Sequence, residues 1–254
     1  MTMPRLVRAS AASFCGPTRP RNEDMAVIGG RCVRDATAEA EWVRDGATRP
    51  FLVAALDGLG GHQGGDQASG RVAERLAATV WRWSSGCSAD ELAAGLSETM
   101  ADAHRELGET GRDDPTRAGC GTTCTALLVA ADAFLMVHVG DTRCYRRRDG
   151  LWKQLTQDHS VVMPDGSGQR VSRLMYAVGA DLPELPPDLV EDLSEKCFPG
   201  DVYLLVTDGV MAAAGSQAAL EAAFDAPDAK GVVDLALANG GPDNATAVRL
   251  ELFQ

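Results

Sequence analysis

The sequence has no apolar run long enough to span a membrane and no excess of basic residues. Its 254 residues carry a formal net charge of −12, so its average field repels nucleic acid and anionic lipid surfaces. The N-terminal stretch MTMPRLVRASAASFCG contains basic residues but lacks the apolar stretch of a signal peptide. We therefore expect a monomeric cytoplasmic protein that binds neither nucleic acid nor membranes.

The cysteines lack the spacing of a disulfide framework or of a zinc site. There are seven, an odd number, and no C-x-x-C pair occurs. Cys120 and Cys124 lie in the strand-like stretch GCGTTCTALLV, where a separation of four residues places both side chains on one face. Because there is no second Cys or His pair, buried reduced thiols are favoured over metal ligands. The thiols have no obvious catalytic role, so a cysteine nucleophile is not expected.

The periodicity of apolar residues predicts many short strands and two pairs of helices. The strand-like runs are Met25–Ile28, Phe51–Leu56, Thr122–Ala130, Phe134–Val139, Cys144–Arg148, Leu151–Leu155, Leu189–Leu193, Val202–Val206 and Ala245–Phe253. The helical stretches are Gln67–Trp83, Ala89–Leu107, Gln217–Phe224 and Ala229–Ala238. Because only short turns separate the strands between residues 122 and 155, these strands pair mainly antiparallel. The pattern indicates an α+β fold in which helical hairpins cover stacked antiparallel sheets.

Two segments show little regular pattern. Val161–Pro187 is rich in Pro, Gly and Asp and is interpreted as a mobile surface segment. The residues around Trp42, between the first two predicted strands, resemble an enlarged loop. Since the chain has no internal repeat and no low-complexity linker, we expect a single domain over residues 1–254.

Acidic residues recur at the ends of the predicted strands. They are Asp57, Asp141, Asp208 and the pairs Glu23-Asp24 and Asp243-Asn244. Clustered carboxylates raise one another's pKa, whereas Mg²⁺ and Mn²⁺ are bound by carboxylate, carbonyl and water oxygens, so the set predicts a divalent cation site. For any single acid the alternative is an ordinary turn after a strand. A nucleotide-binding role for the loop GLGGHQGG is disfavoured because the G-x-x-x-x-G-K-[ST] pattern is missing.

Six stretches of the chain form an ordered series of motifs. They are RPRNEDMAV at Arg19–Val27, ALDGLGGHQGGDQAS at Ala55–Ser69, GTTCTALLV at Gly121–Val129, VHVGDTRCYRRRDGLWKQLTQDHS at Val137–Ser160, VTDGV at Val206–Val210 and GGPDNATAV at Gly240–Val248. In this order they resemble the PP2C (PPM) metal-dependent serine/threonine phosphatases, most closely the bacterial members. The resemblance covers nearly the whole chain. It implies a four-layer α/β/β/α sandwich with two Mn²⁺ or Mg²⁺ ions in a cleft at one end.

The resemblance also implies a role for each of eight residues. The residues that would hold or support the two ions are Glu23, Asp24, Asp57, Gly58, Asp208 and Asp243. Asp57 would bridge both ions, and Gly58 would contribute its carbonyl group. Asp141 matches an acid that helps to hold a third, weaker ion in bacterial members. Arg19 matches the arginine that binds the substrate phosphate, a task suited to a planar guanidinium.

The implied reaction is hydrolysis of phosphoserine and phosphothreonine in proteins. A water molecule activated by two cations attacks phosphorus in line, while the cations, Arg19, Asp57 and Asp208 form the catalytic centre. A partner bacterial Ser/Thr kinase is expected to supply the phosphorylated proteins. The alternative is a catalytically silent PP2C-like module that binds phosphoproteins, which the full set of acids disfavours.

The four histidines and the segment after residue 160 are the remaining candidate features of the sequence. His62, in the glycine-rich loop, is a candidate general acid, although eukaryotic relatives carry a histidine where this chain has Leu59. His138 is expected to be structural, His104 to lie on a helix surface, and His159 to organise the turn that follows Thr156. Bacterial relatives usually have a longer flap after residue 160, so this chain departs from the family pattern in a segment that bears on substrate selection and third-ion binding.

Overall fold

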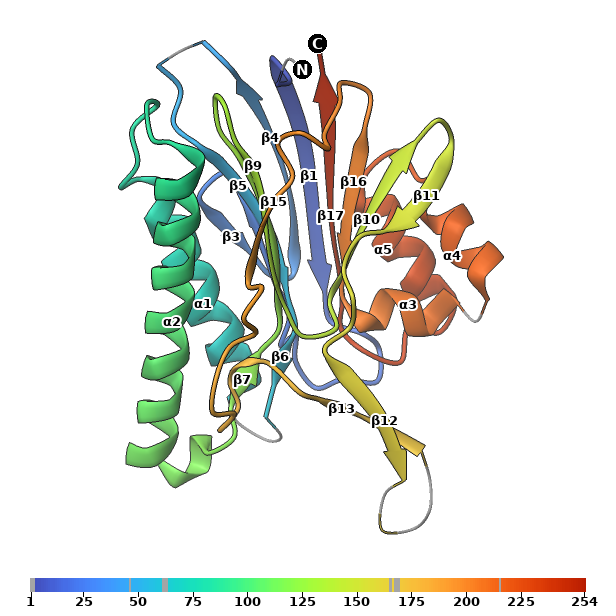
Figure 1. Cartoon of the computed structure of the whole chain (residues 1–254). Coiled ribbons are helices and arrows are strands. Elements are labelled where there is room, and N and C mark those ends of the chain that lie inside the picture. The colour runs from blue at the N-terminus through green and yellow to red at the C-terminus, as the bar shows by residue number, and fades with distance from the viewer. Residues whose placement is uncertain (1–2, 46, 61–63, 165, 167–169, 215) are drawn as a thin grey trace.

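The computed structural model describes residues 3–45, 47–60, 64–164, 166, 170–214 and 216–254. Two six-stranded sheets lie face to face, and helices cover the outer face of each (Figure 1). The predicted α+β class and the four-layer α/β/β/α arrangement are therefore confirmed. None of the helices in the described part of the chain is both long and apolar enough to cross a membrane.

The first large sheet is fully antiparallel and contains strands from both ends of the chain. Its order is β11 (Leu151–Gln154), β10 (Arg143–Arg148), β16 (Val202–Val206), β17 (Ala245–Phe253), β1 (Leu6–Phe14) and β4 (Ala36–Val43). In the register, Phe14 of β1 lies opposite Ala245 of β17. The N-terminal and C-terminal strands are therefore neighbours in the middle of the sheet.

The second large sheet carries most of the predicted central strands. Its order is β15 (Val190–Asp192), β9 (Phe134–Val139), β8 (Cys124–Val129), β5 (Phe51–Leu56), β2 (Met25–Ile28) and β3 (Arg31–Val33). Every residue of β2, β5, β8 and β9 is buried. Such continuous burial is the expected state of strands covered on both faces.

The helices form one pair and one group of three. The pair is α1 (Gly65–Val80) and α2 (Ala89–Asp113), and the group is α3 (Asp208–Ala214), α4 (Gln217–Phe224) and α5 (Ala229–Ala238). A short 3₁₀ helix, η1 (Pro115–Arg117), follows α2. The start of α2 is fixed by a capping box, in which the Ser88 hydroxyl accepts from the Glu91 amide and the Glu91 carboxylate accepts from the Ser88 amide. The helix extends six residues beyond its predicted end at Leu107.

Three apolar cores separate the four layers. One lies between the α1–α2 pair and the second sheet, one between the two sheets, and one between the first sheet and the α3–α5 group. Alternate residues of β5 show the division, since Leu52 and Ala54 face the helices while Val53 and Ala55 face the other sheet. The strand therefore contributes to two cores at once, which explains its uninterrupted apolar sequence.

Several predictions about local structure are wrong. The loop expected around Trp42 is the edge strand β4, and Trp42 is buried near its end. Val161–Pro187 is not irregular throughout, because it includes most of the hairpin of β12 (Ser160–Pro164) and β13 (Arg170–Leu174). It also contains β14 (Val178–Gly179), which joins β7 (Gly121–Thr122) and β6 (Gly58–Leu59) in a small sheet. Not all cysteines are buried: Cys32 is exposed, and Cys15 and Cys87 are half-buried.

Candidate metal centre

The predicted acids lie at one end of the sandwich. In the register, Met25 of β2 pairs with Leu56 of β5, and Val206 of β16 pairs with Ala247 of β17. The acids that precede Met25 and follow Leu56 therefore lie at one end of the second sheet, and those that follow Val206 and precede β17 lie at one end of the first. The hydrogen bond from Thr207 to Asp24 joins these two ends. This end is opposite to the one where β1 begins and β17 ends (Figure 1).

The backbone of Asp57 is held by two threonines of β7 and its continuation. The Asp57 amide donates to Thr123 Oγ1 over 3.0 Å, and the Asp57 carbonyl accepts from Thr122 Oγ1 and from the Thr123 amide, each over 2.9 Å. Both threonines are buried. All backbone polar groups of Asp57 are thus satisfied, and its carboxylate remains available for other partners.

Asp24 connects the two sheets. Its side chain is buried, and its Oδ2 accepts from Thr207 Oγ1 over 2.8 Å. Thr207 Oγ1 in turn accepts from the Thr246 amide over 3.0 Å. Since Thr207 immediately precedes Asp208, this contact ties the segment before β2 to the start of α3. Asp24 therefore supports the position of another predicted ligand.

Glycines allow the backbone segments around Glu23 to approach closely. A Cβ atom on Gly58 would lie 2.2 Å from the Gly65 carbonyl oxygen and 2.5 Å from the Glu23 carbonyl oxygen. The Glu23 amide donates to Asn244 Oδ1 over 2.9 Å, which joins it to the segment before β17. Only glycine fits at position 58, because the start of β2, the end of β5 and the start of α1 meet there.

The acids perturb one another's ionisation. The carboxyl groups of Asp57 and Asp208 lie close enough to influence each other, and the pKa of each is raised, chiefly by burial. Loss of contact with water, together with the charges of Asp24, Asp208 and Asp141, raises the pKa of Asp57 well above its usual value. The same two causes, burial and the charge of Asp208, raise the pKa of Asp141 to about 6. Four predicted ligands therefore lie close enough to repel one another when ionised.

Arg19 contacts one of the predicted ligands directly. Its Nη2 donates to Asp243 Oδ2, and both side chains are partly exposed. Although burial acts in the opposite direction, the charges of Asp243, Asp208 and Glu23 raise the pKa of Arg19. Arg19 is thus a cation that the structure places in direct contact with one of these carboxylates. Within the described ranges, no three His, Cys, Asp or Glu side chains form a closed set of metal ligands.

The donor set nevertheless fits hard divalent cations in its chemistry. The groups are carboxylate and carbonyl oxygens, with no sulfur or imidazole donor among the predicted ligands, and such oxygens are preferred by Mg²⁺ and Mn²⁺. Burial and the charges of Asp208 and Asp243 raise the pKa of Asp24 to about 7. A cation at this end of the sandwich would remove the repulsion that these raised pKa values reflect.

Comparison with known proteins gives the family. The family model for protein phosphatase 2C matches residues 25–166, more than half of the chain. The chain belongs to the protein phosphatase 2C family. The predicted resemblance is therefore confirmed.

Relatives within the protein phosphatase 2C family are similar over most of this chain. The serine/threonine protein phosphatase PstP of Mycobacterium tuberculosis is 30% identical over 96% of the chain and 44% of its own length. Its crystal structure, at 29% identity, covers 98% of this chain and all of that chain with a TM-score of 0.74. A structure of the PstP catalytic domain with two manganese ions, at 28% identity, has the same coverage and a TM-score of 0.70. The chain spans less than half the length of the first curated relatives it matches.

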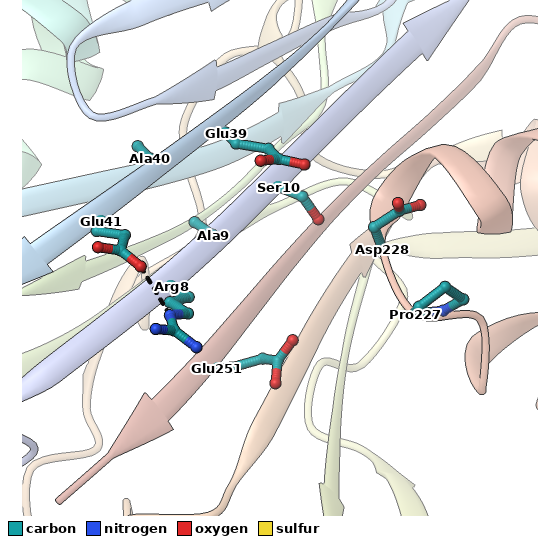
Figure 2. A pocket seen from close by; sticks show the side chains of 9 residues that line it. All are labelled: Arg8, Ala9, Ser10, Glu39, Ala40, Glu41, Pro227, Asp228 and Glu251. Carbon is teal, nitrogen blue, oxygen red and sulfur yellow. Dashed lines mark hydrogen bonds and ion pairs between the residues drawn. The ribbon is translucent and has the colours of Figure 1, made fainter.

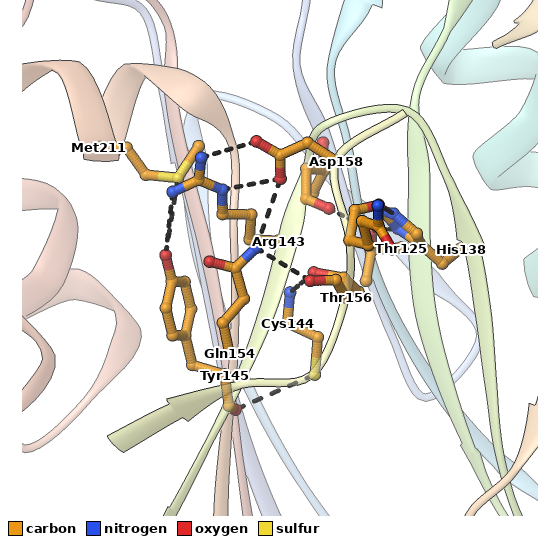
Figure 3. Close-up of polar contacts among 11 residues, drawn as sticks. Thr125, His138, Arg143, Cys144, Tyr145, Gln154, Thr156, Asp158 and Met211 are labelled. Carbon is orange, nitrogen blue, oxygen red and sulfur yellow. Dashed lines mark hydrogen bonds and ion pairs between the residues drawn. The ribbon is translucent and has the colours of Figure 1, made fainter. Parts of the chain in front are cut away.

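A polar network beside the phosphatase 2C motifs was not singled out from the sequence. Arg143 donates from Nε and Nη2 to the two carboxylate oxygens of Asp158, over 2.8 and 2.6 Å, and from Nη1 to the Tyr145 hydroxyl (Figure 3). The hydrogen bonds to Asp158 raise the pKa of Arg143. This pair fixes the chain just after Asp141. The sequence contains one sign of this pair, which is that Arg143 and Asp158 carry opposite charges within the stretch Val137–Ser160.

The histidines fall into different environments. Burial lowers the pKa of His138 to about 4, and its ring is held by Thr125 and the Gln157 carbonyl, so the structural role predicted for it is supported. His159 bonds to both backbone groups of Gly140, so it joins the segment after Thr156 to the turn that precedes Asp141. The prediction for His104 is wrong, because its half-buried ring accepts from the Gly179 amide. His62 lies outside the described residues.

A separate hollow of about 410 Å³ lies on the outer face of the first sheet (Figure 2). It is lined by residues of β1, β4, β17 and the turn before α5, and Arg8 pairs there with Glu41 over 2.7 Å. None of the eight predicted site residues lines it. The hollow is therefore distinct from the end of the sandwich where the acids meet.

The raised pKa values predict how the metal-free chain responds to pH. An unfolded aspartate has a pKa near 3.9, whereas that of folded Asp24 is about 7. Between these values the folded chain binds more protons, so its free energy of unfolding should fall as the pH rises. In EDTA, we expect a lower melting temperature at pH 8 than at pH 5.5.

Thermal unfolding at the two pH values, with EDTA or with excess Mn²⁺, measures this effect. Excess Mn²⁺ should raise the melting temperature most at pH 8, where the carboxylates are ionised. A melting temperature in EDTA that rises between pH 5.5 and pH 8 would contradict the electrostatic account of the site.

Proposed function

We propose that this chain hydrolyses phosphoserine and phosphothreonine in proteins, with two Mn²⁺ or Mg²⁺ ions as cofactors. The observation that carries the proposal is the meeting of Asp24, Asp57, Asp141 and Asp208, whose pKa values are raised by burial and by one another. The names of the PstP relatives and the two manganese ions in one PstP structure support it.

Each site residue has a proposed task. Asp57 and Asp208 would hold the two ions, together with Asp243, and Gly58 would offer its carbonyl oxygen. Bound divalent ions would lower the pKa of a water molecule and neutralise charge on the phosphoryl oxygens. Asp24 and Glu23 support these ligands through the contacts described above, since Asp24 accepts from Thr207 and the Glu23 amide donates to Asn244.

Arg19 has the task of binding the substrate phosphate. Its guanidinium is partly exposed and already lies against a carboxylate, so a phosphate group could replace Asp243 as its partner. This exchange would also leave the Asp243 carboxylate available as a ligand. The phosphorylated proteins are expected to come from a partner Ser/Thr kinase.

The decisive experiment measures phosphate release from a phosphothreonine peptide. The chain should release phosphate with Mn²⁺ and lose this activity in EDTA, and readdition of Mn²⁺ should restore it. The rival is a silent phosphoprotein-binding module, which would bind the peptide without releasing phosphate. Peptide binding without phosphate release in Mn²⁺ would establish that rival instead.

Replacing Arg19 with alanine tests phosphate binding. We expect KM for a phosphopeptide to rise by roughly tenfold or more, because a charge-assisted contact worth about 1.5–3 kcal/mol is lost while the ions remain. Arg31→Ala, at an exposed arginine of β3, is the matched control. Steady-state kinetics of both variants decide the matter, and an Arg19→Ala variant with the wild-type KM would remove Arg19 from the site.

Asp141 distinguishes a third-ion ligand from a turn residue. As a turn former it would tolerate Asp141→Asn with little change in rate. As a ligand of a weakly held ion, its loss should lower kcat and shift the Mn²⁺ concentration that gives half-maximal activity, with KM largely retained. The measurement is kcat against Mn²⁺ concentration for both proteins, and overlapping curves would restrict the reaction to two ions.

A further inference from the structure

A basic pocket lies on the side of the molecule away from the metal centre. It has a volume of about 420 Å³ and lies between β10, β11 and the connection from β15 to β16. Its charged lining residues are Arg146, Arg148, Lys153, Lys196 and Glu191. Four cations against one carboxylate contrast with the net charge of −12 of the whole chain. The volume falls within the range of about 300–1,000 Å³ that is typical of ligand sites.

Two of these cations already have carboxylate partners. Arg148 donates from Nε and Nη2 to the two oxygens of buried Asp201, each over 2.6 Å. Lys196 Nζ lies 2.6 Å from Glu191 Oε1. The charges of Arg148 and Lys196 are therefore balanced within the protein, and these residues fix the connection between β15 and β16.

The other two cations, Arg146 and Lys153, have no carboxylate partner among the residues that the structure describes. Arg146 Nη1 donates only to the Lys196 carbonyl, over 3.3 Å, and the buried Arg146 Nε has no acceptor. The two residues are also direct partners across β10 and β11. Like charges in directly opposed positions destabilise a strand pair. An anion between them would remove this repulsion.

We infer that this pocket binds a phosphate group carried by a protein segment, at a second site remote from the metal centre. A phosphorylated side chain carries about 1.5–2 negative charges and three acceptor oxygens, which match the two unbalanced cations Arg146 and Lys153. The inference that the phosphate belongs to a protein rests on the proposed function. With a strand rise of about 3.3 Å per residue, the five residues from Asp141 to Arg146 span at most roughly 17 Å of chain.

An adjoining hollow favours a protein segment over a free ion. It has a volume of about 490 Å³ and shares Leu155 and Glu191 with the basic pocket. His159 and Tyr176 line it, and the His159 amide donates to the Gly140 carbonyl over 2.8 Å, directly before Asp141. The two hollows thus lead from the basic pocket toward the metal centre. A peptide with one phosphorylated residue at Arg146 and Lys153 could extend along this path.

The test uses nuclear magnetic resonance of the full chain in Mg²⁺. The probe is a peptide that carries a phosphonate analogue of phosphothreonine, whose carbon–phosphorus bond is not hydrolysed. We expect saturable shifts of the Lys153 and Gln154 amide signals. In Arg146→Gln and in Lys153→Gln, the dissociation constant for the peptide, measured from the remaining pocket signals, should be at least tenfold larger. Arg147→Gln is the matched control, because its side chain pairs with Asp225 on the other face of β10.

A second readout is independent of the ligand. Without phosphate or peptide, Lys153→Gln should melt at a temperature no lower than the wild type, because one of two opposed like charges is removed. Unmoved pocket signals, or variants that bind as tightly as the wild type, would overturn the inference. Orthophosphate that binds the pocket as tightly as the peptide would overturn the protein-segment part. Hydrolysis of a phosphothreonine peptide is measured separately, so failure of the proposed function would be recognised independently.

Discussion

Asp208→Asn is expected to lower kcat/KM for a phosphothreonine peptide by about 100-fold or more while leaving the fold intact. Loss of a residue that merely supports a metal ligand typically costs 10–100-fold, so loss of the ligand's own charge should cost at least as much. Burial and the charge of Asp243 raise the pKa of Asp208, so the metal-free fold does not depend on its ionisation. Asparagine has nearly the same shape. The measurement is steady-state phosphate release in saturating Mn²⁺.

The control for this variant is Asp149→Asn. Asp149 is exposed in the turn between β10 and β11, where its φ of 51° suits asparagine equally well. It should therefore keep wild-type activity and stability despite the same change in charge. Wild-type turnover in Asp208→Asn would show that Asp208 is not a ligand.

Gly58→Ala is expected to impair both stability and activity. The new methyl group would lie 2.2 Å from the Gly65 carbonyl oxygen and 2.5 Å from that of Glu23, so two backbone segments must separate. Overpacking of this kind costs about 1–3 kcal/mol, and each kcal/mol lowers the melting temperature by about 2–4 °C in a domain of this size. Since the displaced segments carry Glu23 and Asp57, we expect kcat/KM to fall by about 100-fold.

The matched control is Gly108→Ala in α2, where an added methyl group meets no atom within 4 Å. Alanine stabilises a helix interior by about 0.5–1 kcal/mol relative to glycine. Gly108→Ala should therefore melt slightly above the wild type and keep its phosphate release. Gly58→Ala should melt at a lower temperature and release phosphate more slowly. If Gly58→Ala melted and turned over like Gly108→Ala, the close approach of these segments would not matter for the site.

The strand-end acids could be predicted because each follows or precedes a strongly apolar run. Phe51–Leu56 and Val202–Val206 are apolar almost throughout, so their ends, and hence Asp57 and Asp208, are clear in the sequence. Strands β1 and β4 gave no such signal. Their sequences, LVRASAASF and ATAEAEWV, are rich in Ala, Ser and Glu, and these residues have little preference for strands. Their strand form depends on pairing with β17 and with each other.

Contacts between distant segments could not be derived from local patterns. The hydrogen bond from Thr207 to Asp24 joins residues 183 positions apart, and the Arg19–Asp243 pair joins residues 224 positions apart. The first contact joins the ends of strands in different sheets, and the second depends on the register of β1 and β17 within the first sheet. The pairing of Arg146 with Lys153 is local. That these two cations are the unbalanced ones in the pocket is clear only from the structure, because Asp201 and Glu191 neutralise the neighbouring cations.

The most direct test of the central claim is the number of Mn²⁺ ions that the chain binds. Calorimetric titration of the metal-free protein with Mn²⁺ gives the stoichiometry and affinity of binding without reference to turnover. We predict two tight ions per chain, loss of at least one in Asp208→Asn, and no loss in Asp149→Asn. Absence of saturable Mn²⁺ binding, or the same stoichiometry and affinity in wild type and Asp208→Asn, would contradict a metal centre built from the strand-end acids.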